Sequence, residues 1–175
     1  TSKQNIPIPV RRVTPAISGP VESLELSTAR SVLREAKRPL MIAGVEVLHH
    51  GASQDVVNFC NKFQMPLLTT YKAKGVLPED NVLAIGAVCL SPKADKIILP
   101  LVYESDLILL VGYDPIEMRS SWINVWGSDK SVIEFCDGPN THYVHQASMS
   151  FVGHVGAGLN ALSLGAAAKG VWPDN

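Results

Sequence analysis

The feature that most constrains the fold is an unbroken apolar run, Leu107–Val111, that ends at Gly112. The run is too short for a helix of ordinary length and too uniformly apolar for a strand with one face in water. It therefore predicts a strand buried on both faces of a parallel sheet. Glycine allows a sharp turn there, and Tyr113-Asp114-Pro115 adds turn chemistry. Ligands bind at the carboxyl ends of such strands, so we expect any site at this edge.

Strand-like and helix-like segments alternate along the rest of the chain. The predicted strands cover residues 39–43, 67–70, 131–135 and 149–152, with another short strand at 82–85 before Gly86. The predicted helices cover about residues 23–37, 53–63, 91–103 and 154–164, and Pro100 should kink or interrupt the third helix. No hairpin signal joins neighbouring strands. The alternation predicts an α/β, three-layer Rossmann-like fold with a parallel sheet and helices on both faces.

The composition fits one well-buried domain. The chain has 175 residues, of which 46% are hydrophobic and 18% are charged, so it can bury one sizeable core but is short for two. The 15 basic and 16 acidic side chains give a net charge of -1, and this balance argues against nucleic acid or an anionic membrane as a partner. No apolar run approaches the roughly 20 residues that span a bilayer.

The cysteines and the chain ends suggest the setting of the domain. Cys60, Cys89 and Cys136 are far apart and share no metal-ligand spacing, so we expect small buried side chains in a reduced, cytoplasmic protein. The polar, proline-rich start, which begins at Thr1, is interpreted as a linker from a preceding domain, with no signal peptide. The last residues, from Gly170, are expected to be frayed or linker-like.

Three predicted strands end in a glycine, Gly44, Gly112 and Gly153, and these ends should share one edge of a parallel sheet. Predicted helices follow two of them, and their amino termini would present free amides to a phosphate. The run Gly44-Val45-Glu46-Val47 does not match Gly-x-Gly-x-x-Gly, and no Gly-x-x-x-x-Gly-Lys-Ser/Thr run is present. The glycines are therefore compatible with either a nucleotide crevice or the tight packing of strand–helix turns.

The histidines form no recognisable metal or catalytic set. His49-His50 is predicted to lie in a solvated loop. His142, His145 and His154 share no metal spacing with carboxylates or thiols, and none has an obvious nucleophile partner. We therefore expect neither catalytic nor metal-binding residues in this chain.

Several other polar or aromatic residues have two interpretations. Lys72 and Lys74 follow the second strand and could contact a phosphate, although exposed loop lysines are the ordinary case. Asp114 could accept a ribose hydroxyl or cap its own turn, and the sequence leaves both open. Trp122 and Trp126 are interpreted as packing anchors rather than as a stacking platform.

A series of short segments, in order along the chain, resembles a known family. The segments are residues 38–44, 51–52, 65–70, 74–75, 78–80, 86 and 105–112. In order and spacing they resemble the central domain of thiamine-diphosphate-dependent enzymes over about residues 24–164. The run Gly112-Tyr-Asp-Pro-Ile-Glu117 is most similar to the flavin-free, catabolic branch of the acetolactate synthases.

The resemblance implies a fold, a parent enzyme and its partners. The fold would be a parallel sheet of about six strands of the deoxyhypusine-synthase-like, FAD/NAD-binding type. The parent would be a homo-oligomer that decarboxylates or ligates 2-oxo acids, with thiamine diphosphate and magnesium held between two other domains. The Gly-Asp-Gly motif that holds this cofactor is absent from the sequence. Residues 23–165 are therefore expected to be a central domain without catalysis of its own, with linkers at 1–22 and 166–175 and flanking domains as partners.

The resemblance also points to a nucleotide rim, because some relatives hold FAD or ADP at these strand ends. The matching positions are Gly44, Thr70, Gly86, Gly112 and Asp137. This chain departs from the flavin pattern, since Val45-Glu46 replaces further glycines and Asp114 stands where flavin enzymes carry Arg. Each added negative charge would repel a diphosphate by about 1 kcal/mol or more in a partly buried site. We therefore expect a vestigial site that does not bind FAD or ADP; the alternative is a stand-alone FAD-, ADP- or NAD-binding module.

Overall fold

A six-stranded sheet, ordered β3-β2-β1-β4-β5-β6, forms the centre of the computed structural model, which describes residues 19–119, 122–123, 125–127 and 129–172. All neighbouring strands are parallel. The strands are β1 (Pro39–Ala43), β2 (Leu67–Thr70), β3 (Ala84–Val88), β4 (Leu107–Val111), β5 (Ser131–Cys136) and β6 (Met149–Val152). The order reverses between β1 and β4, as in doubly wound nucleotide-binding folds. The predicted α/β, Rossmann-like architecture is confirmed.

The central pair, β1 and β4, explains the sequence feature that dominated the prediction. Leu40 lies opposite Ile108, and Ile42 lies opposite Leu110. Every residue of both strands is buried. Because helices cover both faces at this position, neither face can carry a polar side chain, and an unbroken apolar run results.

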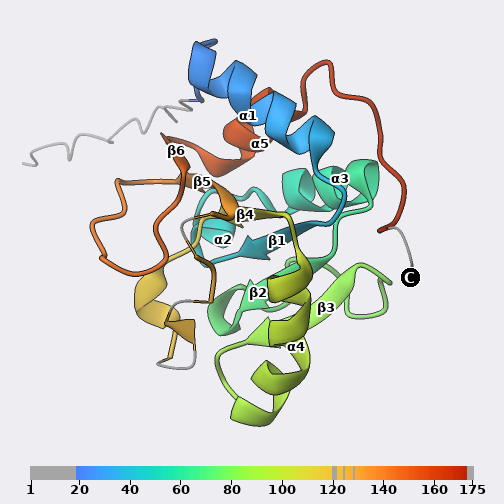
Figure 1. Ribbon diagram of the computed structural model, residues 1–175, viewed down its shortest axis with the longest axis vertical. Helices are drawn as coiled ribbons and strands as arrows, with labels where there is room; N and C mark the ends of the chain where they lie inside the picture. Colours follow the sequence, from blue (N-terminus) through green and yellow to red (C-terminus); the bar gives the residue numbers. More distant parts are fainter. Residues whose placement is uncertain (1–18, 120–121, 124, 128, 173–175) are drawn as a thin grey trace, which may run out of the picture.

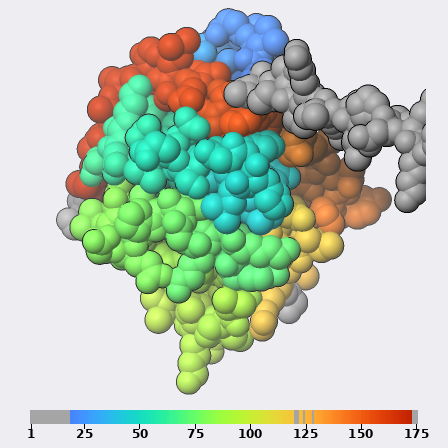
Figure 2. Space-filling view, turned by 180° about the vertical axis from the view of Figure 1, so that it is seen from behind, coloured from blue at the N-terminus to red at the C-terminus, as the bar shows by residue number. Residues whose placement is uncertain are grey.

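Helices cover both faces of the sheet and make three layers (Figure 1). The helices are α1 (Leu24–Glu35), α2 (Glu46–His49), α3 (Ser53–Phe63), α4 (Pro92–Glu104) and α5 (Val155–Ser163), with the 3-10 turns η1 (Tyr71–Ala73) and η2 (Pro115–Glu117). Leu33, Phe63 and Leu159 bring α1, α3 and α5 into one core cluster. Val102 of α4 packs with Trp122 in a second cluster. Figure 2 shows α3 and α5 adjacent on the rear surface.

Local sequence sets the helix ends. Ser23 caps α1, because its Oγ accepts from the amide of Leu26 at 3.1 Å. Helix α3 ends at Gln64, which adopts the left-handed conformation at φ 46, two residues before Pro66 stops any continuation. Pro92 occupies the first turn of α4, where its missing N–H costs nothing.

Three predicted elements need correction. The third strand is Ala84–Val88, not residues 82–85, so Gly86 lies inside it with φ +133 rather than beyond its end. The helix of residues 92–104 continues through Pro100 without interruption. His49 belongs to α2 and His50 is its C-terminal cap, whereas the sequence suggested a solvated loop.

The segment after α5 packs back onto the domain. The Trp172 ring is buried, and its Nε1 donates to the carbonyl oxygen of Pro39 at 3.0 Å. The amide of Lys169 donates to the carbonyl of Lys62 at 3.1 Å. The described part of this tail is therefore anchored rather than frayed, and the linker role of residues 166–175 stays a prediction. Within the described residues, no helix has the length and apolar character needed to cross a bilayer.

Candidate functional site

The carboxyl ends of β1, β4 and β6 meet at one rim, as the glycine pattern predicted. The amide of Gly44 donates to Val111 O at 2.9 Å and that of Gly112 donates to Phe135 O at 2.7 Å. The amide of Gly153 donates to Cys136 O at 2.8 Å. Each glycine thus makes one more bond of the strand ladder before the chain leaves the sheet.

Gly44 and Gly112 are required by backbone packing. A Cβ on Gly44 would lie 2.2 Å from the carbonyl oxygen of Gly112 and 2.6 Å from Cα of Tyr113. Gly112 has φ +58, and a Cβ there would lie 2.7 Å from the amide nitrogen of Val47. These contacts involve main-chain atoms that cannot rotate away. Of the two interpretations of the glycines, packing explains both without any ligand.

Glu46, the first residue of α2, reaches across this rim to the chain that follows β5. Its Oε2 accepts from the backbone amide of Asp137, which follows β5, at 2.8 Å. Burial raises the pKa of Glu46, and the hydrogen bond from Asp137 opposes that rise. A carboxylate of the chain itself therefore satisfies an amide that could otherwise bind a phosphate oxygen.

The rim encloses a small acidic pocket of about 220 Å³. Glu46, Asp114 and Glu134 contribute carboxylates to its lining, and His142 is the one histidine in that lining, with Nε2 3.9 Å from Oδ1 of Asp114. None of its lining residues is a lysine or an arginine. Three carboxylates in partly buried surroundings would repel a diphosphate.

Glu134 is the most deeply buried acid of this pocket and was missed in the sequence. It is 1% exposed, and its Oε2 accepts from Oγ of Ser150 at 2.9 Å while Oε1 accepts from Nδ2 of Asn140 at 3.5 Å. Burial raises its pKa above the ordinary value, and the two hydrogen bonds act in the opposite direction. The available signal was a lone acid within the apolar strand of residues 131–136.

The six predicted rim residues do not form one group. Four of them lie near Glu46. The amide of Glu46 donates to Gly112 O, and its carboxylate accepts from the Asp137 amide. Asp114 lines the same pocket, and Gly44 lies two residues before Glu46 in the chain. Thr70 and Gly86 do not line this pocket, because they belong to β2 and β3 on the far side of β1. Asp114 caps its own turn, since its Oδ1 accepts from the amide of Ile116 at 3.0 Å. Of the two interpretations left open for Asp114, the structure shows the cap.

His50 is mostly buried, contrary to the prediction. Its ring stacks on that of His154 with 4.7 Å between centroids. Its Nδ1 accepts from the amide of Val155 at 3.1 Å, and its Nε2 lies 3.3 Å from Oδ1 of Asp137. The pair thus joins the end of α2 to the start of α5, and no spacing rule in the sequence could have identified it.

His145 completes a closed buried network that was also missed. Its Nδ1 lies 2.7 Å from the hydroxyl of Tyr113, and its Nε2 lies 2.6 Å from the carbonyl oxygen of Trp122. Burial lowers the pKa of His145 and raises that of Tyr113. Trp122 and Trp126 are 0% and 9% exposed, so the prediction that they act as packing anchors is confirmed.

The lysines predicted near the rim face acids instead. Nζ of Lys72 lies 3.9 Å from the buried carboxylate of Glu117, and Nζ of Lys74 lies 3.0 Å from Glu79. Neither residue lines the acidic pocket. The rim thus has no lysine positioned to bind a phosphate among its described lining residues.

The residues present do not fit a metal ion or thiamine diphosphate. Among the described residues, no group of three or more His, Cys, Asp and Glu side chains could hold a metal. The rim amide of Asp137 is taken by Glu46, and the adjacent pocket is acidic. A diphosphate would therefore need neighbouring domains to supply its ligands.

Comparison with known proteins identifies the family. Residues 26–162 match the family described as "thiamine pyrophosphate enzyme, central domain". The chain therefore belongs to the central-domain family of thiamine-diphosphate-dependent enzymes, and the resemblance noted in the sequence is confirmed.

The individual relatives are much longer enzymes. Acetolactate synthase of Bacillus subtilis (strain 168) is 26% identical over 155 residues, which cover 86% of this chain and 26% of that protein. The 2-hydroxyacyl-CoA lyase of Saccharomyces cerevisiae is 27% identical over 163 residues and is covered to the same extent, 26%. The structure of benzoylformate decarboxylase from Polynucleobacter necessarius superposes with a TM-score of 0.72 at 22% identity, covering 96% of this chain and 31% of that one. This chain spans about a quarter of the length of these two curated relatives. The structural match, at 22% identity, shows a shared fold and nothing further.

Proposed function

We propose that this chain is the structural central domain of a thiamine-diphosphate-dependent enzyme that decarboxylates or ligates 2-oxo acids and resembles acetolactate synthase. The parent would be a cytoplasmic homo-oligomer that uses magnesium to hold the cofactor. In it, this domain positions the flanking catalytic domains and contributes to subunit contacts. The domain itself supplies no catalytic residue.

The proposal rests on one observation: a single family domain accounts for residues 26–162, and among the described residues no group of His, Cys, Asp and Glu side chains could hold a metal ion. The histidines at 50, 145 and 154 are used in stacking and hydrogen bonds to the main chain. The acids at 46 and 134 accept hydrogen bonds from the domain itself. These three histidines and two acids therefore each have a structural role.

We further propose that the rim is a vestigial nucleotide site. The arrangement around Glu46 supports this, because the carboxylate binds the Asp137 amide that a pyrophosphate would otherwise contact. The linkers at residues 1–22 and 166–175 would then connect this domain to its neighbours.

The catalytic part of the proposal is tested with the purified 175-residue chain, thiamine diphosphate, Mg²⁺ and pyruvate. We expect no release of CO₂ above the protein-free rate and no calorimetric binding of the cofactor. Turnover that depends on both the chain and the cofactor would contradict the scaffold function.

A second candidate is a stand-alone module that binds FAD, ADP or NAD. The doubly wound strand order favours it, because such sheets bind nucleotides where the strand order reverses. Glu46 argues against it, together with the acidic lining of the pocket. Calorimetry with the three nucleotides separates the candidates, since micromolar binding would support the module.

A further inference from the structure

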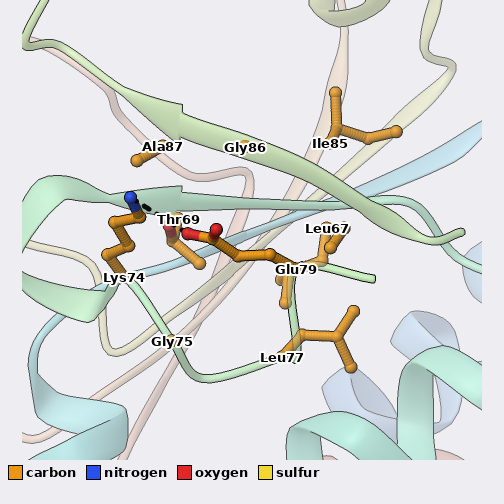
Figure 3. Close-up of a pocket in the computed structure, with 10 residues that line it drawn as sticks. Leu67, Thr69, Lys74, Gly75, Leu77, Glu79, Ile85, Gly86 and Ala87 are labelled. Carbon is orange, nitrogen blue, oxygen red and sulfur yellow. Dashed lines mark ion pairs between the residues drawn. The ribbon is translucent and has the colours of Figure 1, made fainter. Parts of the chain in front are cut away.

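A second pocket lies at the β2–β3 edge of the sheet, away from the acidic rim pocket (Figure 3). Strands β2 and β3 and the 74–79 segment between them form its walls. Its volume is about 380 Å³, within the ~300–1,000 Å³ range of small-molecule sites. Of the six predicted rim residues, only Gly86 lines this pocket.

The inner wall of the pocket is aliphatic. Leu67 and Leu77 line the hollow and are 1% and 3% exposed, so only a small part of each side chain faces it. Ala84 and Ala87 extend this surface from β3, whereas Ile85 packs against the core on the other face of the sheet. None of the described lining residues is aromatic. The wall therefore suits a branched aliphatic group rather than a flat ring that needs a stacking partner.

Two glycines keep space free around the pocket. Gly86 has φ +133 and Gly75 has φ +94, and a Cβ added to either would meet nothing within 4 Å. A glycine within β3 is unusual, because it weakens a strand and gives up side-chain packing. Here the missing side chain leaves empty space beside the edge strand β3.

An ion pair lies at the solvent-exposed part of the pocket. Nζ of Lys74 and Oε1 of Glu79 are 3.0 Å apart, and the two side chains are 62% and 72% exposed. In Figure 3 they point toward each other beside Thr69. Such an exposed pair is weak, so the two groups can separate at small cost. Separated, they would present one cation and one anion next to an aliphatic cavity.

We propose that this pocket binds a free aliphatic α-amino acid. The α-carboxylate would pair with Lys74, the α-ammonium with Glu79, and the branched side chain would lie against Leu67 and Leu77. A simple monocarboxylate would leave Glu79 without a partner, and a simple amine would leave Lys74 without one.

The first test is an amide chemical-shift titration of the 175-residue chain with L-leucine. We expect saturable shifts at Gly75, Gly86 and Ala87, with the amides around Glu46 unmoved. Two analogues that each lack one charge, 4-methylpentanoate and 3-methylbutylamine, should bind about three- to fivefold more weakly, as expected for the loss of one exposed ion pair. This series needs no variant and so is independent of folding.

Variants then assign the contacts. Ala87→Leu should fill the pocket and abolish the leucine shifts, while Lys74→Met and Glu79→Gln should each weaken binding about three- to fivefold. Lys93→Met, on the exposed side of α4, is the matched control and should bind as the unmodified chain does. The proposal is overturned if millimolar leucine moves no pocket amide, or if the singly charged analogues bind as tightly as leucine. Its failure would leave the scaffold function intact, because that function is tested by cofactor binding and turnover.

Discussion

At the scale of single residues, the main chains at the rim pack so closely that two of its glycines cannot be replaced by larger residues. Gly44 and Gly112 let the turns after β1 and β4 touch through their main chains. Glu46 then reaches across to the amide of Asp137 and closes the gap between α2 and the end of β5. Glycines at these positions would be found both in a nucleotide site and in a rim that is only tightly packed. The Glu46 carboxylate separates the two cases, because it binds an amide that a nucleotide site would leave free.

Gly44→Ala should destabilise the domain strongly. The new Cβ would lie within 3 Å of three main-chain atoms of the Gly112–Tyr113 turn, and relief requires the two turns to move apart. We expect a loss of about 1–3 kcal/mol or more in the free energy of unfolding, measured by urea denaturation. Gly138→Ala is the control, because a Cβ there meets nothing within 4 Å. Equal stability of the two variants would contradict the packing role of Gly44.

Glu134→Gln should flatten the pH dependence of stability. Burial raises the pKa of Glu134 above its ordinary value of 4.5, so at pH values between the two the native state binds more protons than the unfolded state. Stability should therefore fall as pH rises through this window, and Glu46 should contribute in the same direction. Urea unfolding at several pH values should show a shallower fall for Glu134→Gln than for the unmodified chain. Glu25→Gln, on the exposed side of α1, should keep the original slope, and an unchanged slope in Glu134→Gln would contradict the account.

At the scale of elements, the segment after α5 acts as part of the domain. The Trp172 ring packs in the α4-side cluster and donates to the start of β1. Its truncation should therefore cost as much as a core substitution, although it lies near the end of the chain.

Trp172→Ala should lower the free energy of unfolding by about 3–5 kcal/mol, the range for truncating a buried tryptophan. Trp172→Phe keeps most of the apolar contact and loses the hydrogen bond to Pro39, so it should cost only about 1 kcal/mol. Both values come from urea unfolding monitored by far-ultraviolet circular dichroism. A Trp172→Ala protein as stable as the original would mean that the tail is only loosely attached.

The sequence predicted elements best where burial left a uniform signal. The apolar runs of 39–43 and 107–111, each followed by a glycine, identified the central pair of strands because both faces are covered there. The edge strand was misplaced, since its residues are half-buried and Gly86 interrupts the pattern. The four-residue helix α2 was missed because so short an element has no periodicity.

The candidate site was less predictable than the fold. Glycine positions located the rim, since close main-chain contacts leave few other choices. Which acids enter the pocket depends on how β5 and the 137–142 segment pack, and spacing along the chain does not encode this. The stacking of His50 on His154 likewise joins residues more than a hundred positions apart.

At the scale of the whole molecule, the three-layer domain keeps the architecture of a nucleotide-binding fold while its rim binds its own side chain. This combination is consistent with the proposed scaffold function, and the chain covers about a quarter of two longer relatives. The β2–β3 pocket is separate from the rim and leaves this conclusion unchanged.

The most direct test of the central claim is an amide chemical-shift titration of the 175-residue chain with ADP, read at Gly44, Gly112 and Asp137. Because Glu46 already occupies the Asp137 amide, these three signals should stay in place at millimolar nucleotide. Saturable movement of the three signals at micromolar ADP would show that the carboxylate yields to a diphosphate, and the rim would then be a working nucleotide site.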